Sequence, residues 1–151
     1  MIGKNELVLL ILLKHKRVEI ERFGARRTRD QKTSDEEALL LRLHLLLVMV
    51  KAALKGYPIG NYRKKAALDN ASAVYRMISK SDLSFLHLNT TAHLLKERVK
   101  LLSVMTTAII SDDYPLGIHR REAVLDNIEV ISTNAFHKKN LRLFPEVLKV
   151  A

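Results

Sequence analysis

The sequence predicts an all-α protein: an antiparallel four-helix bundle built from two repeated helical hairpins, with an additional N-terminal helix and a short C-terminal tail. Five glycines and three prolines lie nearly all at segment boundaries and leave long stretches with helical apolar spacing. A repeated phrase reads YPIGNYRKKAALDNA at 57–71 and YPLGIHRREAVLDNI at 114–128. Such a repeat indicates one supersecondary unit used twice and stacked to bury a shared face. At 151 residues and 48% hydrophobic content, the chain can bury one core.

Local signals divide the chain into a basic N-terminal helix and loop at 1–34, the bundle at 35–139 and a tail at 140–151. The first helix is expected from about Asn5 to Arg22, although its end also shows a short alternation compatible with a strand. Residues 24–34 have no apolar periodicity and are expected to form a loop.

A capping box at Ser34 and Glu37 predicts the start of the second helix, and Gly56 predicts its end. Only Arg42, His44 and Lys51 interrupt its apolar residues, and they point in different directions. A helix that is apolar all round is buried on several sides, so it is either central in the domain or in contact with another subunit.

The repeated turns precede helices expected at about 61–79 and 118–137. Each carries a matching apolar stripe, Ala67, Ala71, Val74 and Ile78 in the first and Val124, Ile128, Ile131 and Ala135 in the second. Between them, residues 82–88 are compatible with a short helical turn, and 91–111 predict a long helix. The tail, cut by Pro145, is expected to be a short helix or a coil.

The formal net charge is +10, and the excess lies mainly in residues 1–34 and 57–80. Such a field attracts polyanions, of which nucleic acid is the most abundant in a cell. With no tryptophan and 5% aromatic residues, a base-stacking or carbohydrate platform is not expected. The absence of cysteine excludes disulfides and thiolate metal sites. The apolar runs are too short to span a bilayer, so a cytoplasmic protein is expected.

Basic residues follow each repeated turn directly, where a helix N-terminus already carries partial positive charge. Cations there are locally unfavourable unless an anion binds, which predicts paired phosphate sites; the alternative is a solvated face paired with nearby acids. A second cluster in the N-terminal segment suits phosphate contact or is an ordinary loop. The candidate nucleic-acid-binding residues are Arg22, Arg26, Arg27, Arg29, Lys32, Arg63, Lys64, Lys65, Arg120, Arg121, Lys138 and Lys139.

The repeated Leu-Asp-Asn, at 68–70 and 125–127, places polar residues in the middle of both helices. Its recurrence suggests a shared role, such as an inter-helix hydrogen bond or the orientation of the repeated arginine, or else a duplication that has not drifted. No catalytic, metal-binding or cofactor motif is present. We therefore expect no enzyme, no metal and no cofactor.

Residues 40–139 resemble the accessory variability determinants, the small basic four-helix proteins of diversity-generating retroelements. The resemblance is carried by Lys55-Gly56-Tyr57-Pro58, Tyr62-Arg63-Lys64-Lys65, the leucines at 94, 95, 101 and 102, Leu125-Asp126-Asn127-Ile128 and Phe136-His137-Lys138-Lys139. It implies an oligomeric, nucleic-acid-binding accessory subunit that partners a reverse transcriptase.

Together these features predict a non-catalytic protein that binds the backbone of RNA or single-stranded DNA as a subunit of a nucleoprotein assembly, with a protein partner such as a polymerase and with itself. The alternative is a structural or protein-interaction module that oligomerises through its apolar second helix. A membrane-surface protein is a third possibility, and it would associate with anionic vesicles.

Overall fold

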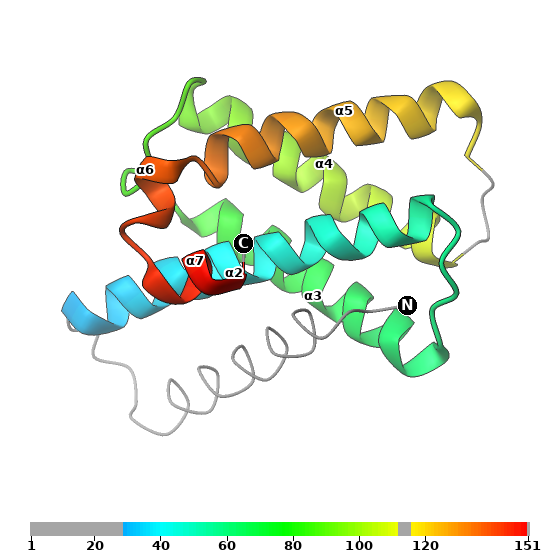
Figure 1. Ribbon diagram of the computed structural model, residues 1–151, viewed down its shortest axis with the longest axis horizontal. Helices are drawn as coiled ribbons and strands as arrows, with labels where there is room; N and C mark the ends of the chain where they lie inside the picture. The colour runs from blue at the N-terminus through cyan, green and yellow to red at the C-terminus, as the bar shows by residue number, and fades with distance from the viewer. Residues whose placement is uncertain (1–28, 112–115, 151) are drawn as a thin grey trace.

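The computed structural model describes residues 29–111 and 116–150. In these residues every regular element is a helix: α2 (Arg29–Leu54), α3 (Asn61–Lys80), α4 (Ala92–Ser111), α5 (Ile118–Ala135), α6 (Lys138–Leu141) and α7 (Pro145–Val150). The helices pack against one another, as Figure 1 shows. The all-α prediction is therefore confirmed. The predicted first helix lies outside the described residues, as do Tyr114 and Pro115 of the second repeat.

The predicted start of the second helix is wrong, because α2 is already helical at Arg29. Residues 29–34 are therefore helix and not loop, and Ser34 is not an N-cap. No glycine or proline lies in this stretch, and adding turns to an existing helix costs little compared with starting one.

The predicted end of α2 is confirmed at Gly56, whose φ of 79° is left-handed. The amide N of Tyr57 donates to the carbonyl O of Ala52 at 3.1 Å, and the amide N of Gly56 donates to the carbonyl O of Ala53 at 3.1 Å. These two hydrogen bonds form a Schellman motif, which requires a residue that tolerates positive φ. The chain then turns through Pro58 into α3.

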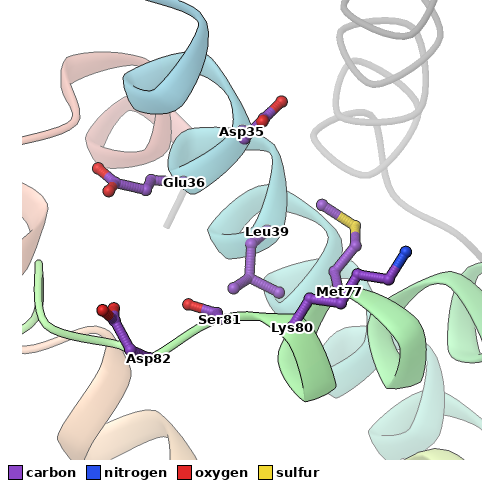
Figure 2. A pocket seen from close by; sticks show the side chains of 7 residues that line it. All are labelled: Asp35, Glu36, Leu39, Met77, Lys80, Ser81 and Asp82. Carbon is purple, nitrogen blue, oxygen red and sulfur yellow. The ribbon is translucent and has the colours of Figure 1, made fainter. Parts of the chain in front are cut away.

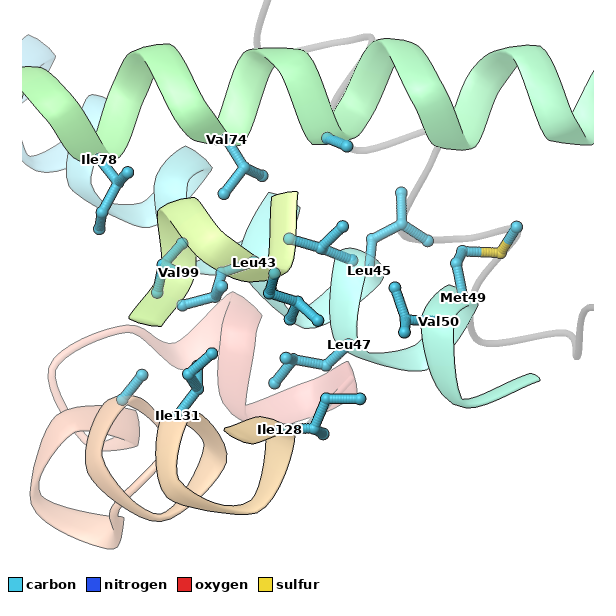
Figure 3. Packing of buried hydrophobic residues seen from close by; sticks show 14 of the residues in the cluster. Leu43, Leu45, Leu47, Met49, Val50, Val74, Ile78, Val99, Ile128 and Ile131 are labelled. Carbon is cyan, nitrogen blue, oxygen red and sulfur yellow. The ribbon is translucent and has the colours of Figure 1, made fainter. Parts of the chain in front are cut away.

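The core lies around α2, which contacts α3, α4, α5 and α7. From Leu39 to Val50 every apolar residue except Val48 is buried. Figure 3 shows Leu43 and Leu47 of α2 among side chains from α3, α4 and α5. The central position predicted for this helix is thus the observed one. Since these apolar residues are covered within one chain, they leave no large exposed surface for a partner subunit; self-association remains a prediction.

The helices that follow the repeated turns match the prediction within two residues at each end. All eight residues of their two predicted stripes are buried. The long helix between them, α4, was predicted from 91 to 111 and also matches. Local apolar spacing was sufficient for α3 and α5, because each of these two helices has a distinct polar side.

The segment between α3 and α4 is a turn and not the short helix considered for 82–88. Leu83 lies in the left-handed region with φ 56°, and its side chain is buried. Asn140 holds this segment: its Oδ1 accepts from the amide N of His87 at 2.7 Å, and its Nδ2 donates to the carbonyl O of His87 at 3.0 Å. A fixed loop of this kind connects α3 and α4 without a helical turn.

The C-terminal tail belongs to the core and forms two short helices, α6 and α7. Phe144 and Val147 are buried, and the Phe144 ring meets the Phe85 ring edge-on at 5.7 Å between centroids. The tail therefore covers one side of α2 and the inter-hairpin loop.

Candidate nucleic-acid interface

The two repeated turns have the same backbone geometry where they enter the following helix. Gly60, the N-cap of α3, has φ −70° and ψ 161°, and Gly117, the N-cap of α5, has φ −66° and ψ 163°. Neither N-cap supplies a side-chain hydrogen bond, and neither first turn contains an acidic residue. Both helices therefore begin with amide groups that no side chain of the N-cap residue satisfies and with a partial positive charge that no acidic residue of their own first turn offsets.

Predicted cations occupy these two helix starts. Arg63 and Lys64 are half-buried at the start of α3, Lys65 is exposed, and Arg120 and Arg121 are exposed at the start of α5. Figure 1 shows that α3 and α5 begin at the same end of the molecule. The described residues form no ion pair between these arginines and the acidic residues of α3 and α5. The alternative that nearby carboxylates neutralise these arginines is therefore not supported.

A flat ring stands beside the cations in both copies. Tyr62 precedes Arg63 and is 87% exposed, and His119 precedes Arg120 and is exposed. Aromatic and imidazole rings of this kind stack on unpaired bases. The sequence prediction did not single out these rings, although their equivalent positions in the repeat carried the signal.

The repeated asparagines join the helices of each hairpin. Asn70 Nδ2 donates to the carbonyl O of Arg42 at 3.0 Å, and Arg42 Nη1 donates to Asn70 Oδ1 at 3.2 Å. Asn127 Nδ2 donates to the carbonyl O of Arg98 at 3.0 Å, and Arg98 Nη1 donates to Asn127 Oδ1 at 3.1 Å. We call each set an Asn–Arg clamp.

The clamps confirm one of the roles considered for the repeated Leu-Asp-Asn, an inter-helix hydrogen bond. Their arginine partners are Arg42 and Arg98 of the preceding helices, and not the repeated Arg63 and Arg120. Both asparagines are buried, so the two-way hydrogen bonding satisfies an amide that would otherwise be costly to bury. Each clamp fixes the register between a hairpin's two helices and so places the cationic helix start.

The exposed side of α3 extends the basic surface beyond the predicted residues. Arg76 and Lys80 follow Lys65 at 11 and 15 positions, spacings that bring them to one side of the helix, and all three are exposed. Asp69, which is also exposed, lies on the same side. The spacing was visible in the sequence, but the prediction considered only the helix start. Lys51 and Lys55, near the end of α2, are also exposed.

The other predicted cations lie elsewhere. Lys138 and Lys139 are exposed on α6, and Arg29 and Lys32 belong to the first turns of α2. Figure 1 shows α6 and the start of α2 at the end opposite the starts of α3 and α5. Lys138 and Lys139 therefore do not lie on the same surface as the cations of those helix starts. Arg22, Arg26 and Arg27 lie outside the described residues.

A hollow of about 440 Å³ lies between the first turns of α2 and the end of α3, as Figure 2 shows. Asp35, Glu36 and Asp82 line it, together with Lys80. Three carboxylates make this hollow a poor phosphate site. In residues 29–111 and 116–150, no three His, Cys, Asp or Glu side chains gather as a metal site would require.

No helix among the described residues combines the length and apolar content needed to cross a bilayer. No family model, curated protein or solved structure matches this chain.

Proposed function

We propose that the protein is a non-catalytic accessory subunit that binds the phosphate backbone of RNA or single-stranded DNA in a nucleoprotein assembly. The observation that carries the proposal is the pair of helix starts at one end of the molecule, each with cations, with no acidic residue in the first helical turn and with no side-chain cap from the N-cap residue. Phosphate oxygens would accept from the free amides and pair with Arg63, Lys64, Arg120 and Arg121.

A single-stranded ligand fits the interface better than a duplex does. Tyr62 and His119 would each offer a ring to one unstacked base beside the arginine that holds the neighbouring phosphate. Stacking on a few rings gives little sequence selectivity, so binding should depend on backbone charge.

The proposed architecture is an antiparallel four-helix bundle made of two equivalent hairpins, α2–α3 and α4–α5. Matching N-caps, matching clamps and matching buried stripes support a duplicated hairpin. In this arrangement the duplication is what brings two phosphate sites to one end, because the equivalent turns of the two hairpins lie at the same end of the molecule.

The protein partner is proposed to be a polymerase or another nucleoprotein component, as the resemblance to the accessory variability determinants implies, with action in the cytoplasm. The structure gives no support to a partner surface on α2, because its apolar residues are buried.

The test is the salt dependence of binding to fluorescein-labelled oligo(dT) and oligo(U), measured by anisotropy. We expect the Arg63→Ala/Lys64→Ala and Arg120→Ala/Arg121→Ala variants to bind more weakly, with the salt slope reduced by about one unit per lost contact. The matched control is Arg142→Ala/Lys149→Ala, which removes two exposed cations near the C-terminus and leaves the starts of α3 and α5 intact.

Folding of each variant is checked by circular dichroism, since exposed charges change stability by under about 1 kcal/mol each. If both helix-start variants bind like the control at every salt concentration, the proposal is wrong. If all three weaken binding equally, only net charge matters and the helix starts are not sites.

A further inference from the structure

The outward side of α4 carries three exposed apolar residues among polar and charged ones. Leu94, Leu101 and Val104 are 53%, 57% and 62% exposed. Their spacings of seven and three residues place them on one side of the helix, where exposed Glu97 and Arg98 lie between Leu94 and Leu101. We call Leu94, Leu101 and Val104 the α4 stripe.

The same positions are packing positions in the other hairpin. When the Arg42 and Arg98 clamps are aligned, Leu94 corresponds to Ala38, Leu101 to Leu45, and Val104 to Val48. Ala38 and Leu45 are buried. In α2 this side of the helix is covered by other parts of the protein. In α4 the corresponding side is exposed.

Two hollows flank the α4 stripe and give it the form of a ridge. One, of about 250 Å³, lies between α4 and α5, and its lining includes Leu101, Met105 and Val124. The other, of about 540 Å³, lies between α3 and α4, and its lining includes Val104 and Tyr75. A ridge between two grooves matches the surface of a second helix, whose side chains form ridges of similar spacing.

Cations lie along both sides of the stripe. Arg98 is held toward α5 by Asn127, and Arg120 lines the smaller hollow. On the other side, Lys96 Nζ donates to the carbonyl O of Ser79 at 3.4 Å, and Lys100 Nζ lies 5.9 Å from the centre of the Tyr75 ring. Glu97 is the acid on this surface of α4, and its Oε1 lies 3.7 Å from Lys100 Nζ. The stripe is therefore framed by net positive charge.

From these observations we infer that the α4 stripe is the docking site for an amphipathic helix of another protein, with an apolar face flanked by Asp and Glu. Its leucines or similar residues cover Leu94, Leu101 and Val104 and enter the hollow beside Met105. Its carboxylates pair with Arg98 and Arg120 on one side and with Lys96 and Lys100 on the other.

A second copy of the chain fits less well, because its α4 would bring an identical frame of cations against this one. A flat anionic bilayer would leave the hollows beside the ridge unfilled and would bring Glu97 against lipid. This inference goes beyond the proposed function and does not depend on it, since the stripe itself contains no residue of the nucleic-acid interface. Arg120 alone borders both surfaces.

The experiment uses two synthetic peptides of about three heptads, each with leucine at the a and d positions. One carries glutamate at e and g, and the other carries lysine there. Binding of the labelled peptides to the full chain is measured by fluorescence anisotropy. We expect the glutamate peptide to bind at least about tenfold more tightly than the lysine peptide, because only the first complements the frame of cations.

The stripe is tested with the variant Leu101→Ser/Val104→Ser, which removes apolar surface without adding charge. Its matched control is Leu143→Ser/Leu148→Ser, in which both leucines are 53% exposed and lie far along the chain from α4. We expect the stripe variant to bind the glutamate peptide at least about tenfold more weakly, and the control to bind as the wild type does. Both variants should retain the wild-type circular dichroism spectrum.

Three results would overturn the inference. They are no binding of the glutamate peptide, equal affinity for the two peptides, or an affinity of the stripe variant for the glutamate peptide equal to that of the wild type. Light scattering that shows a wild-type dimer and a monomeric stripe variant would assign the stripe to a second copy. Vesicle binding that the stripe variant loses would assign it to a membrane. Oligonucleotide binding should be unchanged in the stripe variant, so failure here is distinct from failure of the nucleic-acid proposal.

Discussion

Removal of one clamp should destabilise the protein by an amount that the structure allows us to work out. In Asn127→Ala two hydrogen bonds are lost, one to the backbone of Arg98 and one from its guanidinium. Each contributes about 1 kcal/mol net, and the better helix propensity of alanine returns about 0.5 kcal/mol. We therefore expect a loss of about 1.5 kcal/mol in the free energy of unfolding, or roughly 3–6 °C in Tm.

The neighbouring aspartate provides a matched control. Asp126 is exposed and has the same helical context, so Asp126→Ala gains similar helix propensity without losing a clamp. Its free energy of unfolding should stay within about 0.5 kcal/mol of the wild type. Asn70→Ala and Asp69→Ala form the same comparison in the first hairpin and should differ in the same direction.

A double-mutant cycle isolates the side-chain part of the clamp. Arg98→Ala removes the guanidinium bond but leaves the Asn127 bond to the backbone carbonyl. The two single changes should therefore be non-additive by about 1 kcal/mol, because they share one hydrogen bond. Urea unfolding of the four proteins measures this coupling. If Asn127→Ala is no less stable than Asp126→Ala, or if the coupling is near zero, the clamps do not hold the hairpins.

Three further changes test other parts of the fold, each by urea unfolding. Asn140→Ala should cost about 3 kcal/mol and expose the inter-hairpin loop to amide exchange, because a fully buried amide with four hydrogen bonds is lost. Gly56→Ala should cost about 1 kcal/mol because of its positive φ, whereas Gly60→Ala should be nearly neutral. Phe144→Ala should cost about 3–5 kcal/mol, whereas Leu143→Ala should cost under about 1 kcal/mol.

The helices after the repeated turns could be predicted closely because local chemistry determines them. Gly60 and Gly117 mark their starts, and their apolar stripes have clear helical spacing. The end of α2 could also be predicted from local sequence, since Gly56 needs only its own positive φ. The start of α2 could not be predicted in this way. The capping signal at Ser34 competes there with continuation of the helix through residues that do not break it.

The exposure of α4 could not be predicted from periodicity, because apolar residues occur nearly all round the helix. Leu95 and Leu102 are buried, whereas Leu94 and Leu101, one residue earlier in each case, are exposed. Only the packing of α3 and α5 on either side decides between them. The clamp partners were hidden for the same reason: Asn127 and Arg98 meet only when the register between two helices is known.

The outward sides of α3 and α5 have diverged in charge while their buried sides match. Lys65 corresponds to Glu122, Ser72 to Glu129, and Arg76 to Thr133, and each of these residues is exposed. In the proposed complex, a strand held at the two helix starts would meet Lys65 and Arg76 along α3, where Asp69 is an exposed acid, and carboxylates along α5. Because phosphates are repelled by the second surface and attracted by the first, the strand should leave the interface over α3. In the proposed complex the duplicated turns would provide two phosphate sites, and the difference in charge between the helices after them would give the bound strand a direction.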